Sequence, residues 1–295
     1  MTSAERGGTA AGGPSELAQL AARSGLKKVG SRPGLPEYVR TLWARRHFLW
    51  VLSTSRSYSR NQNNYLGQLW SVLSPLTLAA VYYLVFGLLL DTRAGTTNYP
   101  GFLTIGVFIF MAIAASMTAG STAVTSNITM VRALDFPRAV LPLSVALSEM
   151  LTLLPAIGVM IVIVLLTGEP ITVTWLLLPV ALVLILLFSA GCAMIAARVV
   201  VAARDLRNLI PVAIRLLRYV SGVFFSIEAY AGRFEWGFVL EYQPVAVYLT
   251  LMRSVLLQDV AVDPTMWLTG LAWAVVLFLV GFAVFWSAEE KYGRD

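Results

Sequence analysis

Two arginines, Arg215 and Arg218, stand in an otherwise apolar stretch of the sequence at about 208–228. Residues three apart on a helix share one face, so the two guanidinium groups would point the same way. A guanidinium can hold a phosphate through two parallel hydrogen bonds. We therefore predict that this pair helps to admit a pyrophosphate. The alternative is that both long side chains reach back to the head groups of a membrane.

Aromatic side chains are a second group that could recognise a ligand, because their flat faces can pack against sugar rings. The alternative is that each ring simply packs in the core or faces lipid. The aromatic residues that we predict to line a substrate channel lie in three apolar stretches and are Tyr82, Tyr83, Phe86, Phe108, Phe224 and Phe225.

Several common chemistries are excluded by what the sequence lacks. No Gly-Lys pair occurs, so there is no phosphate-binding loop, and any ATP and its Mg²⁺ must be bound by a separate chain. The one histidine, His47, and the one cysteine, Cys192, can form neither a metal site nor a nucleophilic relay. We predict no bound cofactor, no metal and no catalysis by this chain alone.

The composition places these residues in a membrane. Of 295 residues, 58% are hydrophobic and only 13% are charged, whereas a soluble domain has about 25% charged residues. A spanning helix needs about 20 apolar residues. Five runs meet this length, and the stretch at 208–228 is a sixth candidate whose charges must face protein or water. We predict an all-α integral membrane protein with six transmembrane helices, at about 69–90, 101–122, 140–166, 175–197, 208–228 and 267–287.

The distribution of positive charge predicts the orientation. With the N-terminus inside, all but Arg93, Arg233 and Arg253 of the 22 lysines and arginines fall on inner segments. This bias is typical of multi-pass plasma membrane proteins, and it predicts that both termini are cytoplasmic. The formal charge of +6 does not indicate nucleic-acid binding, which needs a clustered basic face on a soluble domain.

The N-terminal region divides into two parts before the transmembrane domain at 66–295. Residues 1–35 are rich in Gly, Ala and Ser, which predicts a disordered cytoplasmic tail. Residues 36–65 are predicted to form an interfacial amphipathic helix, from Pro36 to about Arg56, and a connector, because aromatic and basic residues alternate there.

The stretch 229–266 is ambiguous, because Glu241, Gln243, Pro244 and Arg253 interrupt an apolar run at 245–257. A full crossing would place the C-terminus outside. We predict instead a re-entrant helical hairpin that dips into the outer leaflet, where protein shields its backbone. Its aromatic residues could form an outer gate, although interfacial aromatics also serve as simple anchors. The predicted gate residues are Tyr230, Phe234, Trp236, Tyr242 and Tyr248.

Four stretches of the sequence carry a family resemblance. They are 65–71 (YLGQLWS) with Pro75, 99–103 (YPGFL), Ser126-Asn127 followed by 136–138 (FPR) and 141–144 (LPLS), and 204–211 (RDLRNLIP). In this order and placement they resemble the ABC-2 type permeases that export O-antigen, teichoic acid and related polysaccharides. The resemblance extends from about residue 37 to the C-terminus. It implies a homodimer that works with two copies of a separate ATPase subunit on a lipid-linked polysaccharide.

The loop at 127–139 is the predicted contact with the ATPase, because it joins two spans on the cytoplasmic side. It combines an apolar anchor with a charged rim, as docking surfaces do. The alternative is a solvated connector. The predicted coupling residues are Met130, Arg132, Leu134, Phe136 and Arg138.

The resemblance also suggests a cargo. The chain resembles mycobacterial exporters of lipid-linked galactan, the arabinogalactan precursor, but it has a long N-terminal tail and, at 58–64 (YSRNQNN), a less basic segment than many relatives. One alternative is a permease for a drug or other small molecule, because the scaffold does not specify the cargo. The other is a membrane glycosyltransferase. Its candidate acids, Glu149, Glu228 and Glu241, show no paired spacing.

Overall fold

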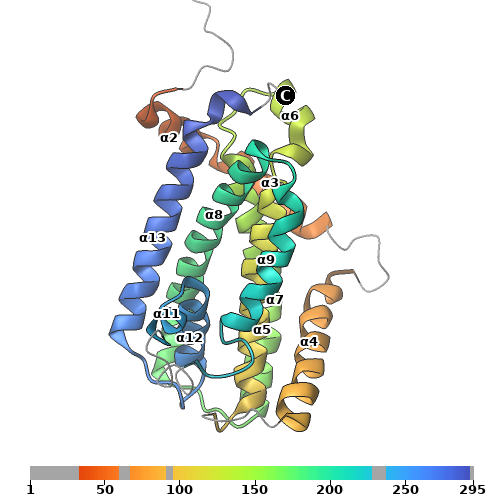
Figure 1. Ribbon diagram of the computed structural model, residues 1–295, viewed down its shortest axis with the longest axis vertical. Coiled ribbons are helices and arrows are strands. Elements are labelled where there is room, and N and C mark those ends of the chain that lie inside the picture. The colour runs from red at the N-terminus through yellow and green to blue at the C-terminus, as the bar shows by residue number, and fades with distance from the viewer. Residues whose placement is uncertain (1–32, 60–66, 91–95, 228–236, 293–295) are drawn as a thin grey trace, which may run out of the picture.

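The computed structural model describes residues 33–59, 67–90, 96–227 and 237–292, and every element in these ranges is helical. The helices form an elongated bundle (Figure 1). They are α2 (Leu35–Ala44), α3 (Arg46–Ser59), η1 (Gly67–Leu69), α4 (Trp70–Tyr82), η2 (Tyr83–Leu89), α5 (Tyr99–Ser121), η3 (Thr125–Asn127), α6 (Ile128–Ala133), α7 (Val140–Leu166), η4 (Val173–Leu177), α8 (Leu178–Ala202), α9 (Leu206–Val220), α11 (Gly237–Glu241), α12 (Pro244–Leu256), α13 (Pro264–Ser287) and η5 (Glu289–Lys291). Most of the predicted tail and the gate residues Tyr230, Phe234 and Trp236 lie outside the described residues.

Five helical segments in the described ranges are long and apolar enough to cross a membrane. They are Trp70–Leu89 (α4 with η2), Tyr99–Ser121 (α5), Val140–Leu166 (α7), Val173–Ala202 (η4 with α8) and Pro264–Ser287 (α13). At 1.5 Å per residue, even the shortest of them spans about 30 Å, the thickness of a bilayer core. These helices agree within a few residues with the five apolar runs of the sequence, so that prediction is confirmed.

The helix at the sixth predicted position is shorter than the sequence suggests. α9 has 15 residues, or about 22 Å, and ends at Val220. Gly222 then takes a φ of 70°, which residues with a side chain rarely adopt, and this turns the chain away from the helix axis. The expected helix from 208 to 228 is therefore wrong beyond Val220.

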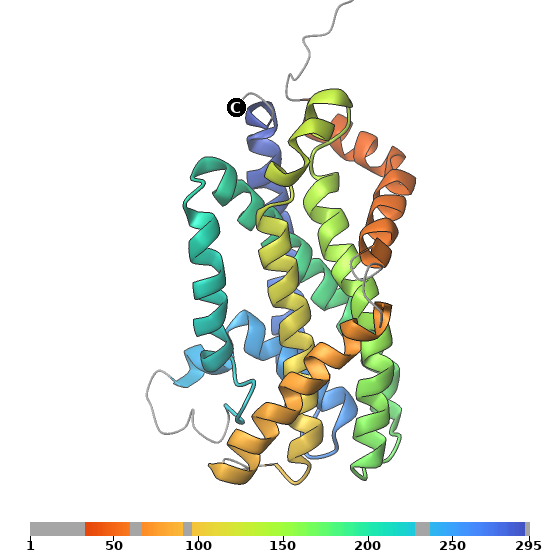
Figure 2. The same cartoon turned by 90° about the vertical axis from the view of Figure 1, so that its right-hand side faces the viewer.

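The N-terminal region forms two helices where one was expected, with a break at Arg45. α2 lies at the end of the bundle that also holds the C-terminus, and α3 descends along the bundle from there (Figures 1 and 2). α3 packs against α7, and the Ser57 and Thr152 hydroxyls are 2.9 Å apart. Trp43 and Trp50 remain exposed.

The short helices α11 and α12 lie in the other half of the bundle, away from the termini (Figure 1). α12 is buried along most of its length, where it packs against α5, α8 and α13. The chain then begins α13 and returns to the end at which it started.

The pair α8 and α13 is held by a very close approach of two backbones. A Cβ atom at Gly191 would lie 2.5 Å from the carbonyl carbon of Leu277, and one at Gly281 would lie 2.6 Å from the carbonyl oxygen of Gly191. Apolar helices in lipid gain little from burying apolar surface, so close packing at small residues is what joins them.

Substituting Gly191→Leu should therefore separate α13 from α8. We expect a melting temperature about 5–10 °C below that of the wild type in detergent, the effect of a strongly overpacked site. The matched control is Gly158→Leu, because a Cβ at Gly158 meets nothing within 4 Å. Equal melting temperatures for the two variants would show that this crossing does not stabilise the bundle.

Candidate functional site: a basic groove between two helices

A groove of about 820 Å³ lies between α5 and α9, two helices that run side by side (Figure 2). α5 contributes small and hydroxyl side chains, including Thr118 and Thr122, and α9 contributes Arg207, Arg215 and Arg218. No acidic side chain is among the described residues that line it. We call this feature the basic groove, and its composition suits an anionic ligand.

The spacing of the arginines along α9 brings them to the groove. Successive residues turn by about 100°, so positions 207, 211, 215 and 218 fall within one narrow sector of the helix. Arg215 and Arg218 were predicted from the sequence, and the structure adds Arg207 to them. The same periodicity, extended two turns back along the helix, would have found Arg207.

The arginines differ in what they already contact. Arg207 and Arg215 are exposed. Arg218 is half-buried, and its Nη1 donates a 3.0 Å hydrogen bond to the Tyr82 hydroxyl. Its guanidinium carbon lies 5.3 Å from the centre of the Phe110 ring. Arg218 therefore ties α9 to α4 and α5, whereas Arg207 and Arg215 are more accessible to a ligand.

Beside Arg218, four rings form a cluster that we call the aromatic cluster: Tyr82, Phe86, Tyr219 and Phe224. Phe224 stacks on Phe86 and meets Tyr82 edge-on, with ring centres 4.6 Å apart in each pair. The ring of Tyr219 is 5.5 Å from that of Phe224. Three of the predicted channel aromatics are thus brought together, but they pack on one another.

The other predicted channel aromatics lie elsewhere. Tyr83 packs near Tyr99, with ring centres 6.2 Å apart, and Phe225 is half-buried. Phe108 is buried and borders a different cavity, described next.

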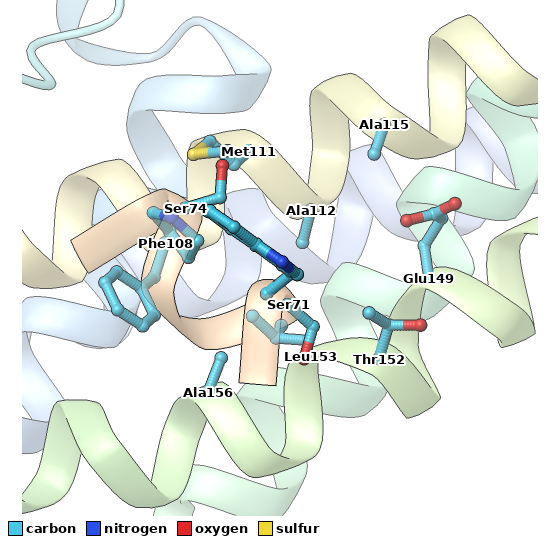
Figure 3. A pocket seen from close by; sticks show the side chains of 12 residues that line it. Ser71, Ser74, Phe108, Met111, Ala112, Ala115, Glu149, Thr152, Leu153 and Ala156 are labelled. Carbon is cyan, nitrogen blue, oxygen red and sulfur yellow. The ribbon is translucent and has the colours of Figure 1, made fainter. Parts of the chain in front are cut away.

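A second cavity, of about 470 Å³, lies between α4, α5 and α7. Figure 3 shows Phe108 at one end of it and Glu149 with Thr152 at the other. Met111 and Ala115 of α5 line both this cavity and the basic groove. The two hollows therefore adjoin along one helix.

The predicted coupling residues separate into two groups around α6. Arg132 and Leu134 are exposed, at the end of the molecule where the C-terminus lies (Figure 1). Phe136 is only 8% exposed and meets the Phe48 ring edge-on, at 5.5 Å between centres. Met130 is half-buried against the apolar cluster that contains Phe136 and Phe48. Arg138 donates a hydrogen bond to the Glu289 carbonyl oxygen. In this structure Leu134, and not Phe136, is the apolar side chain that a partner could reach.

Of the predicted gate residues, two lie in the described ranges. Tyr248 is fully buried, and its hydroxyl donates a 2.7 Å hydrogen bond to the Gly270 carbonyl oxygen. Tyr242 is partly exposed, and its carbonyl oxygen accepts a 3.0 Å bond from Nε1 of Trp273. Tyr248 thus fastens α12 to α13 inside the protomer, and Tyr242 lies nearer the surface.

Arg253 of α12 is a buried cation whose role was not predicted from the sequence. It is 4% exposed. Its Nε, Nη1 and Nη2 donate to the carbonyl oxygens of Phe102, Gly222 and Val223 at 3.3, 2.9 and 3.1 Å. A charged residue within an apolar helix is the signal that could have found it. Arg253 satisfies the backbone where the chain leaves α9.

The apolar helices define a multi-pass membrane protein with a basic groove between α5 and α9. Residues 48–257 match the family of ABC-2 type transporters, and the chain belongs to that family. It is similar to the O-antigen export system permease protein RfbA of Klebsiella pneumoniae, with 27% identity over 239 residues, 80% of this chain and 89% of the relative. The protein of the same name from Myxococcus xanthus is 24% identical over 257 residues, 87% of this chain and 98% of the relative.

Proposed function

We propose that this chain is the membrane subunit of an exporter that moves a lipid-linked polysaccharide from the cytoplasm across the plasma membrane. The observation that carries the proposal is the basic groove, in which three arginines and no described acidic residue line a space of about 820 Å³. A polyprenyl diphosphate supplies the anion that such a groove would attract. ATP and Mg²⁺ bind to a separate ATPase subunit, because this sequence has no phosphate-binding loop.

The proposed topology has six crossings, with α9 as the fifth and α13 as the sixth. Two observations support it: α2, α6 and the C-terminus gather at one end of the bundle, and α11 and α12 lie in the other half (Figure 1). α11 and α12 then belong to the re-entrant part on the outer side. Because α9 is short, the loop after it lies at membrane depth, where Arg253 supplies donors to its carbonyl groups.

The proposed partners are a second copy of this chain and two ATPase subunits. The face of α9 opposite the groove exposes Leu209, Val212 and Leu216, which suits contact with lipid or with a second protomer. The exposed Arg132 and Leu134 beside α6 offer a small apolar contact with a charged rim to the ATPase.

The proposed cargo is lipid-linked galactan, and transport in proteoliposomes tests it. The chain would be purified with its ATPase and given ATP and a labelled polyprenyl-diphosphate-linked galactan. We expect ATP-dependent movement of the label to the side of the membrane opposite the ATPase, and none with a non-hydrolysable ATP analogue.

Two comparison cargoes make the test specific. A labelled O-antigen-type glycan on the same lipid asks whether the glycan matters, and a hydrophobic cationic dye represents drug transport. Equal transport of both glycans would support polysaccharide export and contradict specificity for galactan. Transport of the dye without either glycan would refute the proposed function.

A further inference from the structure

Three segments that are distant in the sequence meet at one buried carboxyl group, that of Glu289. They are α2, the loop between α6 and α7, and the segment that follows α13. Oε2 of Glu289 accepts a 2.9 Å bond from the Tyr38 hydroxyl, and Oε1 accepts a 2.9 Å bond from the Arg138 backbone N–H. The Tyr38 hydroxyl in turn accepts a 3.1 Å bond from the Ala139 N–H. We call these four residues the Glu289 junction.

The junction is closed by the Arg138 side chain. Its Nη1 donates a 2.8 Å bond to the Glu289 carbonyl oxygen and lies 3.7 Å from Oε1 of the same residue. Tyr38 is 1% exposed and Glu289 is 4% exposed. Burial raises the pKa of the Glu289 carboxyl, and the bonds from Arg138 and Tyr38 oppose that rise. Such a group is costly to bury, so each of its partners contributes strongly to its position.

Further contacts join the loop to α3 and the start of α2 to the end of α13. The Phe136 ring packs on Phe48 of α3, and the Tyr38 ring lies 5.8 Å from that of Phe282 of α13. Nε1 of Trp286 at the end of α13 donates a 3.1 Å bond to the Pro33 carbonyl oxygen. The loop, the start of α2 and the end of α13 are therefore packed as one unit.

We propose that Glu289 is the positioning residue that makes the α6–α7 loop, α2 and the end of α13 move together when the loop is displaced. α6 is covalently continuous only with α5 and α7. Without the junction, a displacement of α6 would reach α2 and α13 only through apolar contacts, which can slide, and through one long, exposed bond of 3.5 Å from Nη2 of Arg45 to the Asp135 carbonyl oxygen. With it, four hydrogen bonds and an ion pair transmit the displacement to both helices. This inference rests on the proposed function in one respect, which is that an ATPase displaces α6.

The mechanical part of the proposal can be tested without any transport. Spin labels would be attached to Ala133→Cys and Ser287→Cys in a Cys192→Ala background, in full-length chain diluted with unlabelled chain in lipid nanodiscs. Both labelled positions are exposed. We expect one narrow distance distribution in the otherwise unaltered chain and a clearly broader one with Glu289→Gln. Gln keeps an acceptor for the Arg138 N–H but loses the charge and places an amide donor against the Tyr38 hydroxyl.

Tyr38→Phe is the second variant, because it removes a single hydroxyl and keeps the ring packing. Glu290→Gln is the matched control, since it removes the same charge from the adjacent, exposed side chain. Broadening in Glu289→Gln and Tyr38→Phe but not in Glu290→Gln supports the junction. A narrow, unchanged distribution in Glu289→Gln overturns the proposal, whatever the chain transports.

The coupling part uses the chain with its ATPase and a synthetic polyprenyl-diphosphate-linked oligosaccharide as the stimulant. We expect Glu289→Gln to assemble normally and to lower the stimulated-to-basal ATPase ratio by roughly three- to tenfold, the range that substitutions within coupling networks produce. The double variant Glu289→Gln/Tyr38→Phe should lower the ratio little more than Glu289→Gln alone, because both substitutions act on the same Glu289 junction. If Glu289 has a structural role alone, Glu289→Gln lowers assembly or the melting temperature but leaves the stimulated-to-basal ratio of the assembled complex unchanged. That result would overturn the inference. A wild-type complex that is not stimulated at all would refute the proposed function, while the spin-label result would still decide the mechanical part.

Discussion

Replacing Arg253 with methionine is expected to destabilise the protein by about 3 kcal/mol or more. The substitution removes the guanidinium donors from the carbonyl oxygens of Gly222 and Val223, which lie outside any helix, and from that of Phe102, which keeps its place in the hydrogen-bond ladder of α5. Each unpaired buried carbonyl costs about 1–3 kcal/mol, and measured side-chain hydrogen bonds within membranes lie toward the lower end of that range. For a chain of this size the loss corresponds to a melting temperature about 6–12 °C lower in detergent.

Arg253→Lys separates the effect of charge from that of shape. A lysine keeps the positive charge, but its single nitrogen cannot reach three carbonyl groups in the way that three guanidinium nitrogens do. We expect its melting temperature to lie between those of Arg253→Met and the wild type. The control is Arg204→Met, the same change at an exposed position between α8 and α9. Wild-type melting of Arg253→Met, or of Arg253→Lys, would show that the three contacts do not set stability.

The five long apolar helices were predictable from the sequence, because their length and apolar composition identify them. A crossing requires about 20 apolar residues in any helical membrane protein, so the five long runs carry the information themselves. α9 shows where this reasoning ends. Composition cannot tell that the helix stops at Val220, because the residues after it are stabilised by Arg253, which lies 33 positions further along the chain, in α12. That contact is a property of the packed bundle.

The candidate site was predictable to the extent that it depends on one helix. The helical period places Arg215 and Arg218 on a common face, and the structure has both at the basic groove. Partners on other elements were not visible in the sequence: that Arg218 binds Tyr82 and that Arg138 binds Glu289 follow only from tertiary packing. A residue type can therefore indicate chemistry without showing whether its side chain is already engaged.

The basic groove yields the prediction with the largest functional effect, which concerns Arg207 and Arg215. Both are exposed and line the groove, so Gln at both positions should remove charge while disturbing little packing. Arg218 is left in place, because losing its bond to Tyr82 would disturb the contact between α9 and α4.

We expect the double variant Arg207→Gln/Arg215→Gln to raise the concentration of lipid-linked oligosaccharide that half-stimulates the partner ATPase by about tenfold or more. A hydrogen bond to a charged group contributes about 1.5–3 kcal/mol in a protected site, and 1.4 kcal/mol is a factor of ten in affinity. Water in an open groove reduces each contribution, so about tenfold is the effect expected of the pair. The measurement is ATPase activity in nanodiscs as the synthetic polyprenyl-diphosphate-linked oligosaccharide is titrated.

The matched control is Arg40→Gln/Arg204→Gln, which removes two exposed positive charges that do not line the groove. If the groove binds the diphosphate, only Arg207→Gln/Arg215→Gln should weaken the stimulation of the ATPase. This weakening should persist at raised salt, because salt screens only the long-range attraction between exposed charges. If the arginines merely reach the lipid head groups, both double variants should be stimulated as the wild type is. Equal weakening in both variants would instead mean that the general positive charge at this end attracts the substrate, and the groove would lose its assigned role.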